Sequence, residues 1–189
     1  MKVGIDLGGS HIAIGVVDKN GKILEKVEKK LKGIVTKEVK KVLDKPLIVK
    51  LTPNVSDIAS IAKGAEDGGA DAVSLINTLL AMKIDIYKWK PVLANNTGGL
   101  SGPAIKPVAV RMVYQVSQAV KIPIMGLGGI MTGEDAIEFM LAGAKVVSIG
   151  AGNFADPYTS IKVIEGIEEY MKKCNVENIE DIVGKVEMN

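Results

Sequence analysis

From Thr36 onward, helical and strand-like segments alternate along the chain, and this order constrains the fold more than any other feature. The expected strands are residues 47–51, 72–77, 123–128 and 146–150. The expected helices are residues 36–43, a segment from a cap at Asn54 or Ser56 to about 67, and residues 106–120, 133–142 and 158–173. A longer irregular excursion containing Tyr87 and Trp89 precedes the third helix. Alternation of this kind predicts βα units and a parallel sheet.

The four strand segments are short and apolar, and none shows a period of two: IVKL, AVSLIN, IPIMGLG and VVSIGA. Parallel strands that are covered on both faces have this composition. Four βα units are half the complement of a (β/α)8 barrel. We therefore predict an α/β fold, half of a (β/α)8 TIM barrel with four parallel strands and their helices.

A β-meander is expected before the half barrel. Residues 2–7 and 12–18 are β-rich runs joined by a Gly8-Gly9-Ser10 turn, and a second turn at residues 19–22 leads to Ile23 and Leu24. The charged segment EKVEKKLK, residues 25–32, fits a strand end, a linker or a helix start equally well.

The charge balance and the single cysteine narrow the class of partner. With 24 Lys+Arg against 22 Asp+Glu, no strong electrostatic field favours binding of nucleic acid or of an anionic membrane, so a small molecule or another protein is the expected partner.

Because Cys174 is the single cysteine, an internal disulfide and a CxxC-type metal cluster are excluded. No apolar run reaches the roughly 18 residues of a spanning helix, and the N-terminus lacks a secretory pattern. We expect a cytoplasmic protein without a metal site.

Polar residues and glycines gather where the expected strands end, at Lys50, Asn77, Thr78, Gly128, Gly129 and Gly150. In a (β/α)8 architecture the carboxyl ends of the strands form the active face. The sequence therefore predicts a ligand site at this edge.

Five segments carry a family resemblance: VKLTPNV (49–55), GADAVSLINTL (69–79), ANNTGGLSGPAIKPVAVRMV (94–113), IPIMGLGGIMTGEDAIEFMLAGA (122–144) and GNFADPYTSIKVIEGIEEYM (152–171). Together they are very similar to class 1B dihydroorotate dehydrogenases, and the likeness covers residues 33–189 with GGLSGPAIKP and GLGGI in family order. The resemblance implies FMN as cofactor and oxidation of dihydroorotate to orotate in pyrimidine biosynthesis. It also implies a partner subunit that carries FAD and an iron–sulfur cluster and passes electrons to NAD.

The resemblance gives roles to three strand ends. Lys50 resembles the lysine that touches the flavin ring near N1 and O2, where positive charge stabilises the reduced anionic form; a solvent-directed lysine is the alternative. Ile76 would pack against the cofactor, although a core isoleucine would look the same. Asn77 and Thr78 resemble the pair that hydrogen-bonds the orotate ring, and a polar strand end is the alternative.

The phosphate site implied by the resemblance consists of Gly128-Gly129 and Gly150-Ala151, with Gly102 as another cofactor contact. Glycine allows close approach of the main chain to phosphate oxygens. Taken singly, each of these is equally a turn glycine. The family usually has Gly-Thr where this chain has Gly150-Ala151, so one hydroxyl hydrogen bond is missing and weaker binding is expected.

The family's catalytic cysteine lies in an Asn-Leu-Ser-Cys-Pro-Asn-type segment, which does not occur in these 189 residues. Cys174 matches nothing catalytic, and the first four barrel strands are also absent. The resemblance therefore assigns no catalytic residue here and predicts impaired or absent turnover.

Residues 1–30 resemble a different family, the ROK sugar kinases of the actin-like ATPase superfamily, in which Asp6, Gly8, Gly9 and Ser10 would face ATP and Mg²⁺. The rest of such a site is missing, and His11 has no metal-binding partners. A chimera of two units, residues 1–30 and 33–189, is one hypothesis.

Half a barrel leaves open edges, so we expect either a homodimer that supplies eight strands or a meander that covers one edge. A non-catalytic scaffold that self-associates and an ATP-binding kinase fragment are the alternative functions.

Overall fold

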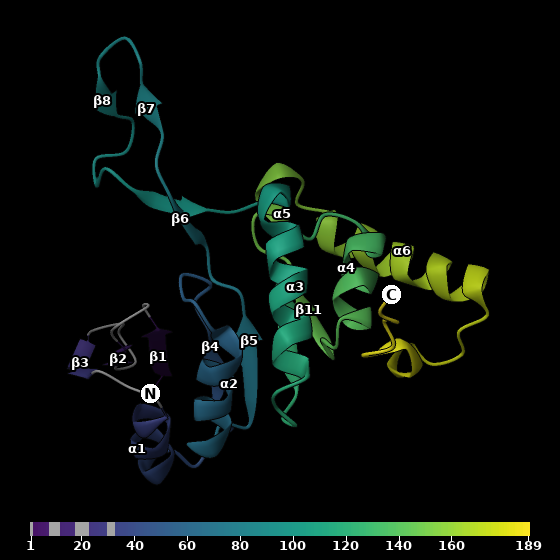
Figure 1. Ribbon diagram of the computed structural model, residues 1–189, viewed down its shortest axis with the longest axis horizontal. Coiled ribbons are helices and arrows are strands. Elements are labelled where there is room, and N and C mark those ends of the chain that lie inside the picture. The colour runs from purple at the N-terminus through teal and green to yellow at the C-terminus, as the bar shows by residue number, and fades with distance from the viewer. Residues whose placement is uncertain (1, 8–11, 18–22, 30–32) are drawn as a thin grey trace.

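The computed structural model describes the chain at residues 2–7, 12–17, 23–29 and 33–189 (Figure 1). Its centre is a four-stranded sheet in the order β11-β10-β5-β4, and every adjacent pair is parallel. The strands are β4 (Ile48–Lys50), β5 (Ala72–Leu75), β10 (Ile124–Leu127) and β11 (Val146–Ser148). All four predicted strands and the α/β half-barrel fold are confirmed.

One face of this sheet is covered by helices. The main helices are α1 (Ile34–Val42), α2 (Ile58–Asp67), α3 (Lys106–Ser117), α4 (Gly133–Leu141) and α6 (Thr159–Cys174). Side chains of α2, α3 and α4 form the core together with alternate residues of the strands. Of these strand residues, Val49, Val73 and Ile124 are each at most 4% exposed. The other face carries Ile48 and Val146, on the two edge strands, and both are about half exposed (48% and 49%).

The helix starts follow local capping chemistry. The cap of α2 is Asp57, whose carboxylate accepts from the Ser60 N–H at 3.1 Å, so the prediction of Asn54 or Ser56 was wrong. Asn54 instead uses its side chain to bridge two loops, as described below. At α4, Thr132 and Asp135 form a reciprocal capping box.

The excursion after β5 is more regular than predicted. β6 (Leu79–Ala81) pairs antiparallel with β9 (Gly98–Leu100), and β7 (Ile84–Asp85) pairs with β8 (Lys90–Pro91). Together, residues 79–100 form a narrow two-stranded projection, here called the arm, which extends well away from the body (Figure 1). A 3-10 turn, η1 (Pro103–Ile105), then leads into α3.

The C-terminal part packs against α4. The short helix α5 (Gly152–Ala155) precedes α6, and η2 (Ile179–Ile182) places Ile182 against Ile137 and Met140. The helices α4 and α6 cross at Gly133 and Gly166, where a β-carbon on Gly133 would lie 2.5 Å from the Gly166 carbonyl carbon. Only glycines allow this approach.

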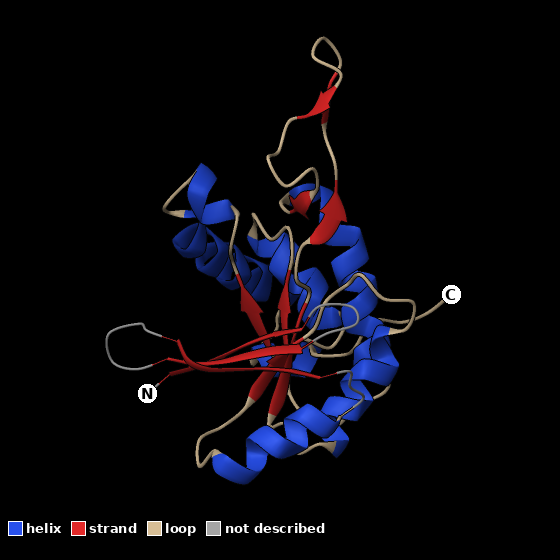
Figure 2. Cartoon of the chain, turned by 90° about the vertical axis from the view of Figure 1, so that its left-hand side faces the viewer, coloured by secondary structure: helices blue, strands red, loops and turns tan. Residues whose placement is uncertain are grey.

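The N-terminal segment is an antiparallel sheet of β1 (Lys2–Leu7), β2 (Ile12–Val17) and β3 (Ile23–Lys29), which confirms the meander and assigns residues 25–29 to a strand. β1 lies near the edge strand β4, and the meander runs at an angle to the parallel strands (Figure 2). The predicted turns at Gly8–Ser10 and residues 19–22, His11, and the end of the 25–32 segment lie outside the described residues.

Candidate functional site

The ends of β4, β5 and β10 are tied together by backbone hydrogen bonds. The Ile76 N–H donates to the Leu127 carbonyl at 2.8 Å, and the Asn77 N–H donates to the Leu51 carbonyl at 3.0 Å. The Ile76 side chain is buried, and a β-carbon on Gly128 would lie 3.3 Å from its Cγ1. The buried Ile76 side chain thus packs against the turn after β10.

The turn after β10 requires glycine. Gly128 and Gly129 have φ values of 137° and 80°, in the left-handed range that other residues avoid. A β-carbon on Gly129 would lie 2.6 Å from the Gly102 carbonyl oxygen. The fold therefore brings Gly102, 27 positions earlier in the chain, against the β10 turn.

The turn after β11 lies beside the turn after β10. A β-carbon on Gly152 would lie 3.1 Å from the Ile130 carbonyl oxygen and 3.1 Å from the Met131 sulfur. Gly150 and Ala151 occupy the two positions before Gly152, at the end of β11. Gly102 and the turns after β10 and β11 therefore lie next to one another.

This surface has the properties of an anion site. The N–H groups of Gly128, Gly129, Gly150 and Ala151 donate to no acceptor among the described residues. A β-carbon on Gly102 or Gly150 would meet no atom within 4 Å, so space remains above the backbone. Backbone donors that have no acceptor in the protein suit a phosphate, which supplies several strong acceptors. The residues present fit the phosphate end of a nucleotide-like cofactor.

Lys50 marks the far end of the same edge. It closes β4, its side chain is exposed, and it has no ion-pair partner among the described residues. In the order β11-β10-β5-β4, three inter-strand spacings separate β4 from β11, which is roughly 14 Å along the edge. The Lys50 ammonium group and the glycine turns therefore lie at opposite ends of one sheet edge.

Asn77 and Thr78 lie between these ends, on the segment that leads into the arm. Asn54 holds this segment: its amide nitrogen donates to the Thr78 carbonyl at 3.0 Å, and its oxygen accepts from the Leu80 N–H at 2.8 Å. The Thr78 side chain lies against Gly99 on the returning strand of the arm. Asn77 is half-buried, and its side-chain amide makes no hydrogen bond with the described residues.

Comparison with known proteins identifies the family. The model of the dihydroorotate dehydrogenase family matches residues 16–171. The chain belongs to this family. The catalytic subunit of dihydroorotate dehydrogenase B (NAD(+)) from Alkaliphilus oremlandii is 66% identical over 152 residues, which is 80% of this chain and 50% of the relative. The corresponding subunit from Lachnoclostridium phytofermentans is 55% identical over 168 residues, or 89% and 56% of the two chains.

A solved structure supports the fold. The dihydroorotate dehydrogenase of Eimeria tenella, crystallised in complex with ferulenol, superposes with a TM-score of 0.62 at 26% identity and covers 74% of this chain and 38% of that one. The chain spans about half the length of the curated relatives it matches.

A charged cluster that was not predicted frames the site of this dihydroorotate dehydrogenase-family chain. The Lys106 ammonium, next to Gly129, lies 2.6 Å from both the Asp135 and Glu138 carboxylates and ties the start of α3 to α4. These two hydrogen bonds raise the pKa of Lys106. Burial tends to raise the pKa of Asp135, but hydrogen bonds from Lys106 and from the Met131 and Thr132 N–H groups lower it below 3.8 overall.

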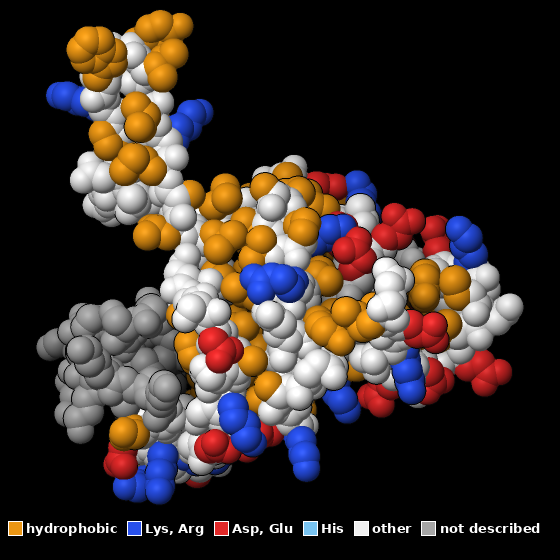
Figure 3. Space-filling model, viewed as in Figure 1, with side chains coloured by type: hydrophobic (Ala, Val, Ile, Leu, Met, Phe, Trp, Pro, Cys, Tyr) orange, Lys and Arg blue, Asp and Glu red, His pale blue; other side chains and the backbone are white. Residues whose placement is uncertain are grey.

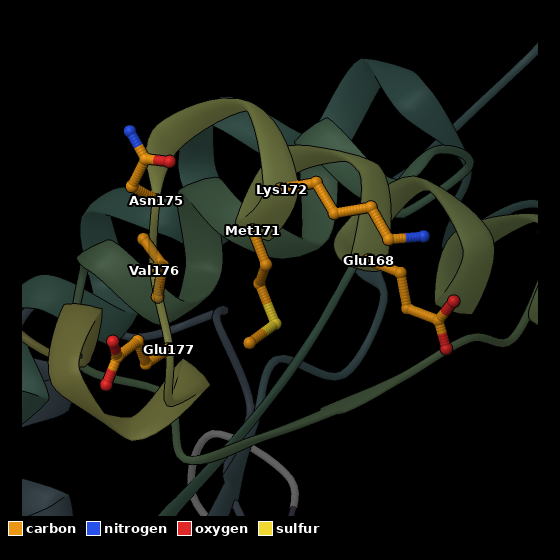
Figure 4. Close-up of a pocket in the computed structure, with 6 residues that line it drawn as sticks. All are labelled: Glu168, Met171, Lys172, Asn175, Val176 and Glu177. Carbon is orange, nitrogen blue, oxygen red and sulfur yellow. The ribbon is translucent and has the colours of Figure 1, made fainter.

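Three hollows formed by described residues lie away from this edge, and none of the three is lined by a predicted site residue. Figure 4 shows the side chains that line one of these hollows, a cavity of about 430 Å³ at the end of α6. Two further cavities lie between α1 and α2 and between α4 and α6. Within the part of the chain that the structure describes, no His, Cys, Asp and Glu side chains cluster as metal ligands, and no helix is long and apolar enough to cross a membrane.

Proposed function

We propose that this chain binds FMN at the carboxyl edge of its sheet, as the flavin-binding half of a dihydroorotate dehydrogenase. The observation that carries the proposal is the set of N–H groups at Gly128, Gly129, Gly150 and Ala151, which make no hydrogen bond among the described residues, together with the open space at Gly102 and Gly150. Lys50 at the opposite end of the edge supports the orientation. The phosphate then lies at the glycine turns and the ring system lies toward β4.

Each residue has a distinct task in this proposal. The glycine turns supply backbone donors to the phosphate, and the missing hydroxyl at Ala151 weakens this end. Lys50 places a positive charge beside the ring and stabilises negative charge that develops there. Asn77 and Thr78 present polar groups to an orotate-like ring, and Ile76 supports the wall on which the ring system lies. When bound, FMN supplies the two-electron redox chemistry.

We propose that turnover of dihydroorotate by this chain alone is negligible. Oxidation requires a base that removes a proton from the substrate, and the cysteine segment that supplies this base in the family does not occur in these 189 residues. Cys174, the single cysteine, is exposed at the last residue of α6. Loss of a general base typically costs about 10²–10⁴-fold in rate. The chain can therefore bind FMN without oxidising dihydroorotate at an enzymatic rate.

The names of the relatives support a proposal about partners. The relatives are named as catalytic subunits of an NAD(+)-linked enzyme. We propose an electron-transfer partner that carries FAD and an iron–sulfur cluster, and a cytoplasmic location. Pyrimidine biosynthesis is the corresponding pathway.

Flavin titration of the purified chain tests the proposal. We expect quenching of added FMN fluorescence with a stoichiometry of one per chain, and a bound-flavin absorbance band near ~450 nm. Riboflavin, which lacks the phosphate, is the matched control ligand and should bind at least about 100-fold more weakly because it loses charge-assisted hydrogen bonds. Equal affinity for FMN and riboflavin would contradict the assignment of the glycine turns. Rapid bleaching of bound flavin by dihydroorotate would contradict the proposed lack of turnover.

Self-association as a non-catalytic scaffold is a second candidate function. It is favoured by the half-exposed Ile48 and Val146 on the two open edges of the sheet. Two copies would then close a barrel of eight strands. A chain that binds no FMN, and whose doubled mass is lost in an Ile48→Lys variant, would support this candidate. The chimeric origin and the kinase-like reading of residues 1–30 stay predictions, which an ATP titration tests.

A further inference from the structure

Three charged side chains lie directly beside the turn after β10, where the phosphate is proposed to bind. The Lys106 ammonium is 2.6 Å from a carboxylate oxygen of Asp135 and 2.6 Å from one of Glu138. The backbone of this lysine adjoins the turn, because a β-carbon on Gly129 would lie 3.1 Å from the Lys106 nitrogen. These three residues, here called the charge cluster, carry one positive and two negative charges, so their net charge is −1.

Asp135 brings negative charge close to the glycine turn. Its carboxylate accepts hydrogen bonds from the N–H groups of Met131 at 2.8 Å and Thr132 at 3.0 Å. Met131 is two positions after Gly129, so the carboxylate lies within about 10 Å of the Gly129 nitrogen. This is about one Debye length at 0.1 M salt. The charge of Asp135 is therefore only partly screened from a phosphate at the turn.

Lys106 has a position that its own helix disfavours. It is the first residue of α3, where the partial positive charge of the helix dipole opposes a cation. The first turn of α3 has no acidic residue, whereas that of α4 has Glu134 and Asp135. Glu134 lines the hollow between α4 and α6, together with Lys162 and Lys173. The ammonium of Lys106 is thus stabilised by the facing carboxylates of α4 and not by α3.

Without Lys106, two carboxylates would stand beside each other on one face of α4. Asp135 and Glu138 are three positions apart, a spacing at which side chains on a helix are neighbours and like charges repel. The Lys106 and Asp135 side chains are only 22% and 14% exposed, so water screens them less than it screens surface charges. The hydrogen bonds to both carboxylates raise the pKa of Lys106, which keeps the ammonium charged.

The overall charge of the chain favours anion binding only weakly. On the face shown in Figure 3, acidic and basic side chains are interspersed over the helices of the body. The formal net charge of the whole chain is +2. Because salt screens distant exposed charges, the field at the glycine turns depends mainly on nearby groups, and the charge cluster is among them.

We propose that Lys106 sets the preference of this site for a phosphorylated ligand, because it neutralises the Asp135 and Glu138 carboxylates beside the glycine turn. The inference rests on the proposed FMN site and deepens it. The Lys106 ammonium already has two carboxylate partners, so it acts through them and is a positioning residue. Its effect is to let the backbone N–H groups of the turn hold a dianionic phosphate close to two acidic side chains.

The ratio of the affinities for FMN and riboflavin isolates this effect, because the two ligands differ only in the phosphate. Lys106→Gln removes the positive charge and leaves both carboxylates beside the turn. Coulomb's law over about 10 Å, with an effective dielectric constant of about 20 and partial screening by salt, gives a factor of roughly 3–30 in affinity. We expect the dissociation constant of FMN to rise about tenfold and that of riboflavin to change less than about twofold.

Substitution of Glu138 separates charge from structure. In the Lys106→Gln background, Glu138→Gln returns the net charge of the cluster to −1, so at least about threefold of the lost FMN preference should be recovered. A purely structural role predicts no recovery, since the double variant has lost both ion pairs of Lys106. Glu138→Gln alone changes an exposed side chain (49%), and it should raise the FMN preference about threefold or more. This single variant tests the charge effect even where Lys106→Gln unfolds.

Lys40→Gln is the matched control. The Lys40 ammonium lies 2.5 Å from Asp71, whose carboxylate also accepts from a backbone N–H, that of Leu47, at 2.6 Å. This pair stands directly before β5, at the opposite end of the strands from the glycine turns. Lys40→Gln should leave the ratio of FMN to riboflavin affinity unchanged. Urea unfolding of every variant measures any loss of stability separately.

Three results would overturn the proposal. In the first, the unmodified chain prefers FMN and Lys106→Gln keeps this preference. In the second, Lys106→Gln loses the preference but Glu138→Gln restores none of it, which would mean that Lys106 meets the phosphate itself or only holds the turn. In the third, Glu138→Gln alone leaves the preference unchanged or lowers it. Equal affinity of the unmodified chain for FMN and riboflavin is a different outcome, because it would remove the phosphate site and both proposals with it.

Discussion

Replacement of Gly150 by valine isolates the proposed phosphate site from the rest of the fold. A β-carbon at Gly150 would meet no atom within 4 Å, and its φ lies outside the left-handed range. The added side chain therefore occupies the open space above the turn after β11 without displacing protein atoms. In that space the phosphate would approach the N–H groups of Gly150 and Ala151.

The expected loss of affinity follows from those two donors. A hydrogen bond to a charged group contributes about 1.5–3 kcal/mol, so loss of both weakens FMN binding by about 3–6 kcal/mol. At ~1.4 kcal/mol per factor of ten, this is roughly a 10²–10⁴-fold rise in the dissociation constant. The free energy of unfolding should change by no more than about 0.5 kcal/mol, as for other exposed substitutions.

FMN titration and urea unfolding of the same samples measure both quantities. Ala155→Val is the matched control, since it adds similar bulk at an exposed position of α5. It should leave both quantities near their original values. If Gly150→Val bound FMN within about threefold of the unmodified chain, the phosphate would not lie at the β11 turn. If the free energy of unfolding of the variant instead fell strongly, the valine side chain would be displacing protein atoms, which contradicts the open space at Gly150.

Three further predictions concern the remaining parts of the site. Lys50→Gln should lower the midpoint potential of bound flavin by about 30 mV or more, equivalent to about 1.4 kcal/mol for two electrons, and an unchanged potential in spectroelectrochemical titration would remove Lys50 from the ring. Asp135→Asn should cost about 1–3 kcal/mol of stability at pH 7. Because the folded-state pKa of Asp135 is lowered, the carboxylate stabilises the fold above its ordinary pKa and loses this effect as the pH falls through the lower folded value. The cost in urea unfolding should therefore shrink below about pH 4, and a pH-independent cost would refute the ion pair. Gly133→Ala should lower the free energy of unfolding by about 1–3 kcal/mol, because its β-carbon would lie 2.5 Å from Gly166 at the α4–α6 crossing. Gly166→Ala should cost less, because its β-carbon would lie 3.0 Å from its nearest neighbour, and equal costs in urea unfolding would contradict this packing.

The sheet was predictable from the sequence because its signals are local. Each strand is a short apolar run bounded by polar or glycine residues, and each helix has apolar residues at helical spacing, as in Ile58, Ala62 and Ala65. Parallel pairing follows from the alternation itself. The cap of α2 was missed because Asn54, Ser56 and Asp57 are all good capping residues, and only the structure shows that Asn54 is used between two loops.

The parts that could not be predicted depend on contacts between distant positions. Lys106 meets Asp135 and Glu138 across 29 and 32 positions, and no pattern in the sequence joins them. The arm contains pairs of only two or three residues, too short for an alternating pattern to identify strands. The contact between Gly102 and Gly129 also appears only when η1 and the β10 turn are placed side by side.

The arm and the candidate flavin site are joined through the backbone. The arm begins directly after Thr78 and ends two positions before Gly102, so both of its ends adjoin candidate site residues. Contacts that order the arm also restrict the segment that Asn54 holds through Thr78 and Leu80. Ordering of the arm and binding of FMN at this site are therefore linked, and any coupling free energy between them must be reciprocal.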